Sequence, residues 1–522
     1  MSNTTSTSGP KADDAKRIAD GYAFQGPALE FGSVVLDGAV YPDAHIRVPL
    51  STLNRHGLIA GATGTGKTKT LQVLTEQLSA AGVPVVIADV KGDLSGLAQA
   101  GTSNAKVTQR ATDTQDDWTP TAYPVEFLAL GGVGTGVPLR ATMTSFGPTL
   151  LAKVLGLNDT QESSLELVFH FADKAGLALL DLKDLQAVIR YLTSAEGKAD
   201  LAGLGGLSST TAGVILRELI GLSDKGGDVF FGEPEWETKD LLRTSSDGRG
   251  VISSIELTNL QDRPQLFSTF LMWLLADLFH ELPEVGDLDK PKLVFFFDEA
   301  HLLFDDASKA FLDAVTQTVR LIRSKGVGIF FVTQNPTDIP DAVLGQLGNR
   351  VQHALRAFTP DDAAALSKAV KTYPKTKDYD LSDDLTRLGI GEAIITVLSE
   401  TGAPTPVAWT RLRPPRSLMG QLDAAAQQQA VTSSPLTATY GQAVDRESAY
   451  EKLAARLATA SPPAGHAAPQ REHRDHAEKA AAAGVVGGLL ASPAFKSFAR
   501  SAASSLGREI TRGLFGTRSR RR

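Results

Sequence analysis

The chain has 522 residues, of which 42% are hydrophobic and 21% charged, a composition typical of a globular protein of roughly two to four domains. Its net charge of −7 excludes a uniformly basic surface, and the absence of cysteine excludes disulfides, thiolate metal sites and cysteine nucleophiles. There is no uninterrupted apolar run of about 18 residues, and the polar start from Met1 to Lys11 is unlike a signal peptide, so we expect a cytoplasmic protein without a transmembrane segment.

The first residues of the chain predict little regular structure. Residues 1–27 begin with a polar, Ser/Thr-rich stretch and are expected to be disordered. Residues 28–55 carry short alternating apolar pieces, such as Val34 to Leu36 and His45 to Val48, which are broken by Gly and Pro. This pattern predicts a small β element ahead of the main fold.

The clearest motif lies at residues 61–68. An apolar run (Leu58 to Ala60) leads into a segment that fits G-x-x-x-x-G-K-[ST], and a helical pattern with Leu71, Leu74 and Leu78 follows. Such a strand–loop–helix unit turns backbone N–H groups toward one point at the positive end of a helix dipole, where phosphate binds. A glycine-rich turn with a chance Lys–Thr pair is the alternative, and the flanking pattern argues against it. The predicted nucleotide-binding residues are Gly61, Ala62, Thr63, Gly64, Thr65, Gly66, Lys67 and Thr68.

Two side chains of this loop have distinct expected roles. Lys67 is expected to reach the β- and γ-phosphates, and the hydroxyl of Thr68 is expected to bind Mg²⁺. The sequence therefore predicts ATP and Mg²⁺ as cofactors.

A second strand and a helical stretch follow the motif. Val83 to Asp89 predicts a strand buried in a parallel sheet, and it continues into the polar segment Asp89 to Asp93. Those carboxylates stand where α/β sheets bind ligands, although a polar turn with a helix cap at Asp93 is an equal alternative. After a strand at Val125 to Leu130, residues 146–245 predict an inserted helical subdomain.

Paired acids end the next apolar strand, Lys292 to Phe297. Asp298 is expected to hold the Mg²⁺ shell, and Glu299 to orient and polarise the attacking water. His301 is expected to be structural. Gln334 ends the following strand, where it would sense the γ-phosphate or bond the water; a satisfied turn amide is the alternative.

The order of these elements is that of a RecA-like P-loop NTPase, an α/β fold with a mainly parallel sheet. Its core is predicted in two parts, residues 56–145 and 246–417, on either side of the helical insertion. In this layout a neighbouring subunit commonly supplies an arginine to the transition state. Arg320, Arg323, Arg350 and Arg356 are candidates, with Arg323 and Arg350 preferred.

The composition changes after the core. Residues 418–476 are rich in Ala, Gln, Ser and Pro and predict a linker with one helical patch. Residues 477–522 predict a basic amphipathic helical tail, with Lys496, Arg500, Arg508 and Arg512 in one row. From Arg471 onward there are eleven basic and four acidic residues, so this part has a net charge of about +7 and the rest of the chain about −14. The tail could contact a membrane surface, a phosphate backbone or a partner, or pack on its own chain.

The chain resembles the HerA/FtsK class of P-loop ATPases and, more narrowly, the bacterial HerA-like family typified by YjgR. The segments that carry this resemblance are Gly61 to Thr68, Asp89 to Leu94, Asp298 to His301, Thr333 to Pro336, Gly507 to Glu509 and Gly513 to Gly516. The resemblance runs from about residue 28 to the tail. It implies a RecA-like core, ring hexamers and, as in HerA, DNA translocation beside a nuclease partner.

Two functions remain open at this point. The first is an ATP-driven DNA translocase or helicase-like motor that works as a ring. The second is an ATPase of the same fold whose client is a protein or a membrane-associated complex. A DEAH helicase is excluded because the sequence offers one P-loop domain and no second domain with an arginine motif, and no L-S-G-G-Q-like signature of an ABC ATPase precedes Asp298.

Overall fold

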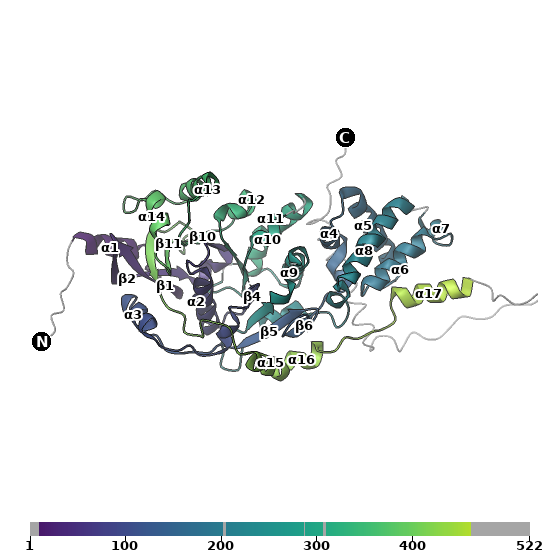
Figure 1. The fold of residues 1–522 in the computed structure, drawn as a ribbon, viewed down its shortest axis with the longest axis horizontal. Coiled ribbons are helices and arrows are strands. Elements are labelled where there is room, and N and C mark those ends of the chain that lie inside the picture. Colours follow the sequence, from purple (N-terminus) through teal and green to yellow (C-terminus); the bar gives the residue numbers. More distant parts are fainter. Residues whose placement is uncertain (1–9, 202–204, 287, 306–308, 461–522) are drawn as a thin grey trace, which may run out of the picture.

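The computed structural model describes residues 10–201, 205–286, 288–305 and 309–460, which fold around one twelve-stranded sheet (Figure 1). The strand order is β2-β1-β12-β11-β10-β3-β9-β8-β4-β7-β5-β6. The strands are β1 (Ala28–Leu36), β2 (Ala39–Pro49), β3 (Gly57–Ala60), β4 (Val85–Asp89), β5 (Val125–Leu130), β6 (Val137–Leu139), β7 (Ile252–Glu256), β8 (Leu293–Phe297), β9 (Val327–Thr333), β10 (Asn349–Gln352), β11 (Glu392–Thr396) and β12 (Ala408–Leu412).

The eight strands from β10 to β6 all run parallel, which confirms the predicted mainly parallel sheet. β9 lies between β3, which leads into the phosphate-loop motif, and β8, which leads into the paired acids. The carboxyl ends of these three parallel strands share one edge of the sheet. This order brings the two motifs and Gln334 to that edge and gives the RecA-like fold that the sequence predicts.

The central strands are apolar because helices or other elements cover both faces of the sheet. Along β8, Phe295 and Phe297 belong to one core cluster, whereas Val294 and Phe296 belong to the cluster on the other face. Side chains alternate between faces in a strand, so a run of consecutive apolar residues is what a doubly covered strand requires.

The predicted small β element at residues 28–55 is present as β1 and β2, and these two strands extend the core sheet itself. β1 pairs antiparallel with β12, and β12 pairs antiparallel with β11, which continues to β10. The sequence did not reveal β12, a five-residue strand flanked by Pro404, Pro406, Pro414 and Pro415. Those prolines suggested an exit from the fold rather than a strand.

The prediction of disorder for residues 1–27 is wrong for the described part. Helix α1 spans Pro10–Asp20 and buries Ala15 and Ile18, which lie three residues apart on one helical face. Tyr22 follows this helix, is fully buried and donates its hydroxyl to the Ile395 carbonyl at 2.9 Å. The few apolar residues of this segment were enough for docking, although its overall composition is polar.

The remaining helices cover the sheet or form the predicted insertion. The helices of the sheet region are α2 (Lys67–Ala80), α3 (Ala105–Asp113), α9 (Pro264–Glu281), α10 (His301–Phe304), α11 (Lys309–Ile322), α12 (Asp341–Leu344), α13 (Pro360–Lys371) and α14 (Leu381–Arg387). The helices of the insertion are α4 (Met143–Val154), α5 (Asp159–Lys174), α6 (Leu182–Thr193), α7 (Lys198–Leu201) and α8 (Ser209–Asp224). They gather at one end of the molecule, beyond β6 (Figure 1), which confirms a helical insertion in the ATPase fold.

The chain after β12 is a packed strap, in which the predicted helical patch is present as a helix but the predicted linker around it packs on the fold. The strap, residues 413–460, runs back below the sheet to the insertion and contains α15 (Ala424–Ser433), α16 (Pro435–Tyr440) and α17 (Ala449–Ala460) (Figure 1). Tyr440 is buried and its ring lies 4.4 Å from that of Trp236, while Ser448 donates a hydrogen bond to Asp184 of α6. The predicted basic tail, residues 477–522, lies outside the described residues.

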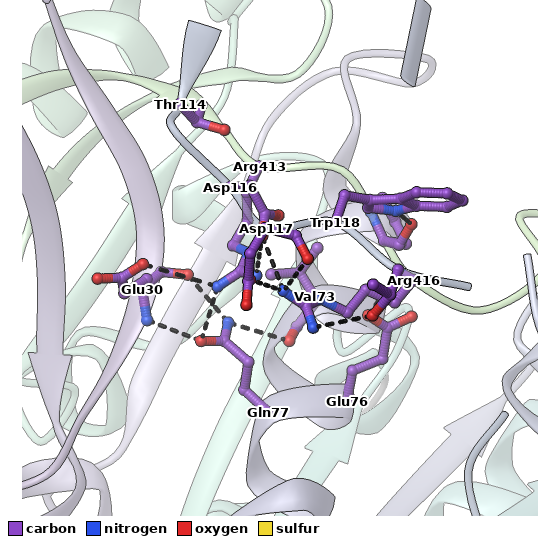
Figure 2. Close-up of polar contacts among 12 residues, drawn as sticks. Glu30, Val73, Glu76, Gln77, Thr114, Asp116, Asp117, Trp118, Arg413 and Arg416 are labelled. Atoms are coloured by element: carbon purple, nitrogen blue, oxygen red, sulfur yellow. Dashed lines mark hydrogen bonds and ion pairs between the residues drawn. The ribbon is translucent and has the colours of Figure 1, made fainter. Parts of the chain in front are cut away.

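A polar network joins the start of the strap to α2 and to the segment that follows α3 (Figure 2). The side chain of Asp116 is 2% exposed. Its carboxylate accepts hydrogen bonds from Nε and Nη2 of Arg413, at 2.9 and 2.5 Å, and from Nη2 of Arg416 at 2.9 Å. Glu76 of α2 is buried and accepts the backbone N–H groups of Arg416 and Ser417 at 2.8 and 2.9 Å. Because α2 follows the phosphate-loop motif, this network attaches the strap to the helix that carries the motif.

Asp116→Asn should destabilise the fold by about 3 kcal/mol, because it leaves two largely buried arginines without their shared carboxylate. The free energy of unfolding from chemical denaturation would measure this loss. The matched control is Asp383→Asn, which breaks a pair with Arg387 in which both side chains are more than 60% exposed. We expect the control to cost no more than about 0.5 kcal/mol. Equal effects of the two substitutions would contradict the network's stabilising role.

Candidate active site at the carboxyl edge of the sheet

The phosphate-loop motif is held from both neighbouring strands. Gly61 N donates to Thr333 O of β9 at 3.3 Å, and Ala62 N donates to Ala354 O, just beyond β10, at 2.8 Å. Gly64 and Gly66 have φ values of +80° and +116°, a region that L-residues rarely adopt. No side chain caps the N-terminus of α2, which leaves its first N–H groups directed into the loop.

Lys67 is folded onto its own loop. Its ammonium donates to the carbonyl oxygens of Gly61 at 2.7 Å and Ala62 at 3.2 Å. Burial lowers the pKa of Lys67, and the opposing charges of Glu299 and Asp298 act in the other direction. A partly desolvated ammonium held only by neutral carbonyls is well suited to exchange them for phosphate oxygens.

Asp298 and Glu299 follow β8 at the same edge. Burial, reinforced by the charge of Glu299, raises the pKa of Asp298 to about 7, and one of its oxygens accepts the Glu299 N–H at 2.9 Å. Glu299 has φ +48°, a strained conformation for a non-glycine residue that is found more often at functional sites. Burial opposes ionisation of Glu299, but the hydrogen bond and charge of Lys91 outweigh it and lower the pKa of Glu299.

Gln334 reaches the motif from the end of β9. The Thr63 hydroxyl lies 3.4 Å from Gln334 Oε1, and Gln334 also contributes to lowering the pKa of Glu299. Its side chain is exposed. The structure therefore brings the predicted Lys67, Asp298, Glu299 and Gln334 together around one phosphate loop.

Residues behind the loop were missed from the sequence. His353 is buried, its Nε2 lies 2.8 Å from the Thr70 hydroxyl, and a Cβ on Gly61 would stand 2.5 Å from its own Cβ. Burial and the charge of Lys67 lower the pKa of His353 to about 3, so it is neutral at physiological pH. A histidine after a short strand gives no sequence signal for this role.

A second missed contact supports the far side of the loop. Gly391 N donates to Thr65 O at 3.0 Å. Arg110 of α3 fixes this contact because its guanidinium donates to Gly391 O at 2.8 Å and Ile390 O at 3.0 Å. The sequence separation of 281 residues between Arg110 and Gly391 hides the contact.

In the polar segment after β4 the carboxylate of Asp89 organises a turn, as one of the two sequence alternatives expects. Asp89 is buried and accepts the N–H groups of Gly92 at 2.7 Å and Leu94 at 3.0 Å, so it organises the turn. Burial raises the pKa of Asp89 to about 6. The side chain that enters the site from this turn is Lys91, which forms an ion pair with Glu299.

The four candidate arginines lie in different places. Arg320 and Arg323 are exposed, and Arg323 precedes β9, at the edge of the sheet opposite the phosphate loop. Arg350 lies within β10, where burial lowers its pKa and its guanidinium donates to Leu344 O at 3.4 Å. Arg356 is exposed beyond β10, with its guanidinium 5.8 Å from the Phe358 ring. The preferred Arg323 and Arg350 thus do not join the site of their own chain.

The donor set fits a nucleotide with Mg²⁺. The glycine conformations and the uncapped start of α2 suit phosphate, and the oxygens of Thr68 and Asp298 are hard ligands of the kind that Mg²⁺ takes together with phosphates. Within the described ranges, no group of three or more His, Cys, Asp or Glu could hold a metal by itself. A site of this type needs only one or two protein ligands beside the phosphates.

A sequence-family model described as "Helicase HerA-like C-terminal" matches residues 36–522. The chain belongs to this HerA-like family. It is 23% identical over 360 residues to a probable helicase of Methanocaldococcus jannaschii, covering 66% of this chain and 63% of the relative, so it spans less than two thirds of that protein. It is 19% identical over 393 residues to the DNA double-strand break repair helicase HerA of Saccharolobus solfataricus, covering 74% of this chain and 70% of the relative.

Solved structures similar to this HerA-like chain include those of TrwB and VirB4. The bacterial conjugative coupling protein TrwB is 15% identical with a TM-score of 0.49, covering 78% of this chain and 95% of the other. VirB4 of Thermoanaerobacter pseudethanolicus is 15% identical with a TM-score of 0.47, covering 74% of this chain and 97% of the other. Among the described residues of the HerA-like chain, no helix has the length and apolar character needed to cross a membrane.

Lys67→Ala should lower ATP turnover by about 100-fold or more and weaken nucleotide binding, because the loop loses the ammonium expected to move from the Gly61 and Ala62 carbonyls to the phosphates. Steady-state turnover and calorimetric binding of ATP would measure both effects. The control is Lys290→Ala, since Lys290 also donates to main-chain carbonyls, those of Ala81 and Gly82, but is exposed at the opposite edge. An unchanged rate of ATP turnover in Lys67→Ala would contradict the assignment of residues 61–68 as the phosphate-binding loop.

Glu299→Gln should leave ATP binding intact and reduce turnover by about 100-fold, so that ATP rather than ADP accumulates on the protein. The bound nucleotide can be separated and identified after single-turnover mixing. Glu284→Gln, an exposed position before β8, is the control. Normal turnover in Glu299→Gln would exclude Glu299 as the residue that orients water.

Proposed function

We propose that this HerA-like chain is an Mg²⁺-dependent ATPase that works as a ring-shaped DNA motor. The observation that carries the proposal is the convergence of Lys67, Asp298, Glu299 and Gln334 at the carboxyl edge of three adjacent strands. Family membership supports a motor ATPase of the HerA class.

The chemistry assigned to the site is phosphoryl transfer to water. The loop residues 61–68 bind the phosphates, and Lys67 exchanges its carbonyl partners for the β- and γ-phosphate oxygens. Mg²⁺, held by Thr68 and by the shell of Asp298, would neutralise charge on the terminal phosphates. Glu299 orients the attacking water, and Gln334 contacts the γ-phosphate or that water.

A ring is proposed because the site lies at an exposed edge and the two preferred arginines, Arg323 and Arg350, do not reach the site of their own chain. In ATPases of this layout, a neighbouring subunit supplies that arginine, which increases the rate by orders of magnitude. Arg323 remains a candidate for this role, because it is exposed away from its own site. Arg350 is less suited, because it is partly enclosed and already bonded to Leu344.

DNA is the proposed client. One relative is named as a DNA double-strand break repair helicase, and the predicted basic tail supplies local positive charge on a chain of net charge −7. A nuclease or another protein partner is part of the same proposal, by analogy with HerA.

The second candidate is an ATPase that acts on a protein or membrane-associated client. The same basic amphipathic tail favours it, because such a helix also binds anionic membranes or a partner subunit. Both candidate functions use the same ATP site, and they differ in which client accelerates ATP hydrolysis there.

The ATPase rate of the full chain, with and without double- and single-stranded DNA, separates these candidates. For a DNA motor we expect DNA to stimulate turnover, with an activating concentration that rises steeply between about 50 and 200 mM salt. The control is the variant truncated before Lys496, which should keep nucleotide binding and show whether the tail carries the stimulation. Indifference to DNA, together with stimulation by anionic liposomes, would replace the first candidate with the second.

A further inference from the structure

Lys91 contacts Glu299 and, like His301, has no part in the proposed catalytic roles. It forms an ion pair with Glu299 Oε1, and the two side chains differ in exposure, 46% for Lys91 and 8% for Glu299. The carboxylate is thus enclosed and belongs to a residue with a strained backbone φ of +48°, whereas the lysine reaches it from a solvent-accessible position.

The turn that carries Lys91 is fixed on three sides. The Asp89 carboxylate accepts the N–H groups of Gly92 and Leu94 from within the turn. Gln261, which precedes α9, donates to Val90 O at 2.6 Å. From the strap, Gln421 Nε2 lies 3.5 Å from Lys91 O. The main chain that carries Lys91 is therefore in contact with the strap and with the segment before α9, as well as with the sheet.

The pair has a direct consequence for hydrolysis. A carboxylate that orients a water molecule must offer that water an oxygen as hydrogen-bond acceptor. The ammonium of Lys91 donates to Oε1 as a charge-assisted donor, and Nδ1 of His301 lies 3.4 Å from the other carboxylate oxygen, Oε2. While the pair persists, Lys91 competes with water for Oε1 and sets the direction in which the carboxylate faces.

We propose that Lys91 is a positioning residue that holds Glu299 in a paired, slowly hydrolysing conformation until the turn from Asp89 to Leu94 moves. The turn's attachments to the strap and to the start of α9 are the route by which a bound client would move it. The step involves only exchange of hydrogen-bond partners, with no bond made or broken. This inference rests on the proposed ATPase function.

Lys91→Met keeps the length of the side chain and removes its charge. If the pair holds Glu299 in about nine of ten molecules, its loss should raise the client-free kcat about 10-fold, with KM and ADP affinity unchanged within about twofold. Lys91→Arg should retain the pair and the low rate. Steady-state kinetics of the full chain and calorimetry with ADP measure these quantities.

Three further variants make the result specific. The double variant Lys91→Met with Glu299→Gln should lose the gain entirely, because the gained rate passes through Glu299. Lys239→Met removes an exposed lysine that pairs with Glu237 and should leave kcat unchanged. Lys91→Gln provides a second neutral substitution if Lys91→Met does not fold.

A kcat of the neutral variants that is unchanged or lower than that of the wild type would overturn the inference, as would a gain that survives Glu299→Gln. These outcomes are distinguishable from failure of the proposed function. If the wild type neither binds nor hydrolyses ATP, the proposed ATPase is wrong. If it does both and Lys67→Ala does not, only the role of Lys91 is at issue.

Discussion

Main-chain hydrogen bonds from β9 and from the end of β10 hold the start of the phosphate loop, and the rest of the site depends on this support. Gly61 N and Ala62 N are both bonded to neighbouring carbonyls, which fixes where the loop leaves the sheet. The loop then needs residues with positive φ at Gly64 and Gly66 to turn its N–H groups inward. The buried His353 and the Arg110–Gly391 contact fill the space behind it. A loop supported in this way is preorganised, so phosphate binding requires little rearrangement.

Desolvation at the same edge determines the charge of the site. Asp89 and Asp298 are buried side chains whose pKa values are raised to about 6 and about 7. The positive charges of Lys67 and Lys91 face this group, and Lys91 pairs with Glu299. Bringing a divalent cation to Asp298 would favour its ionised form, because an opposite charge nearby lowers a carboxyl pKa. A cation bound at this edge would therefore shift its buried carboxyls toward the ionised form.

Much of the fold was readable from the sequence because its signals are local. The apolar run before Asp298 had to be a strand covered on both faces, and the P-loop motif stands between a strand and a helix, as its chemistry requires. The misread regions depend on distant partners. β12 is a short strand between prolines that forms only by pairing with β1 and β11, and α1 docks through a few apolar residues. The strap beyond residue 418 looked like a linker because its contacts are distant in sequence, such as that of Ser448 with Asp184 across 264 residues.

The candidate site divides in the same way. Lys67, Asp298, Glu299 and Gln334 belong to motifs, whereas Lys91, His353 and Arg110 act through contacts that no spacing predicts. The Asp89 segment illustrates the limit. Its carboxylates attracted notice in the sequence, but its lysine is the residue that meets Glu299, because the buried Asp89 folds the turn around its own oxygens.

The most direct test of the central claim is a structure of the full chain with Mg²⁺ and a non-hydrolysable ATP analogue. The account predicts the triphosphate on the backbone N–H groups of residues 64–68, with Lys67 moved from the Gly61 and Ala62 carbonyls to phosphate oxygens. Mg²⁺ should lie against the Thr68 hydroxyl, with Asp298 in its shell. A nucleotide bound elsewhere, or a metal remote from both residues, would contradict the assignment of this edge as the ATP site.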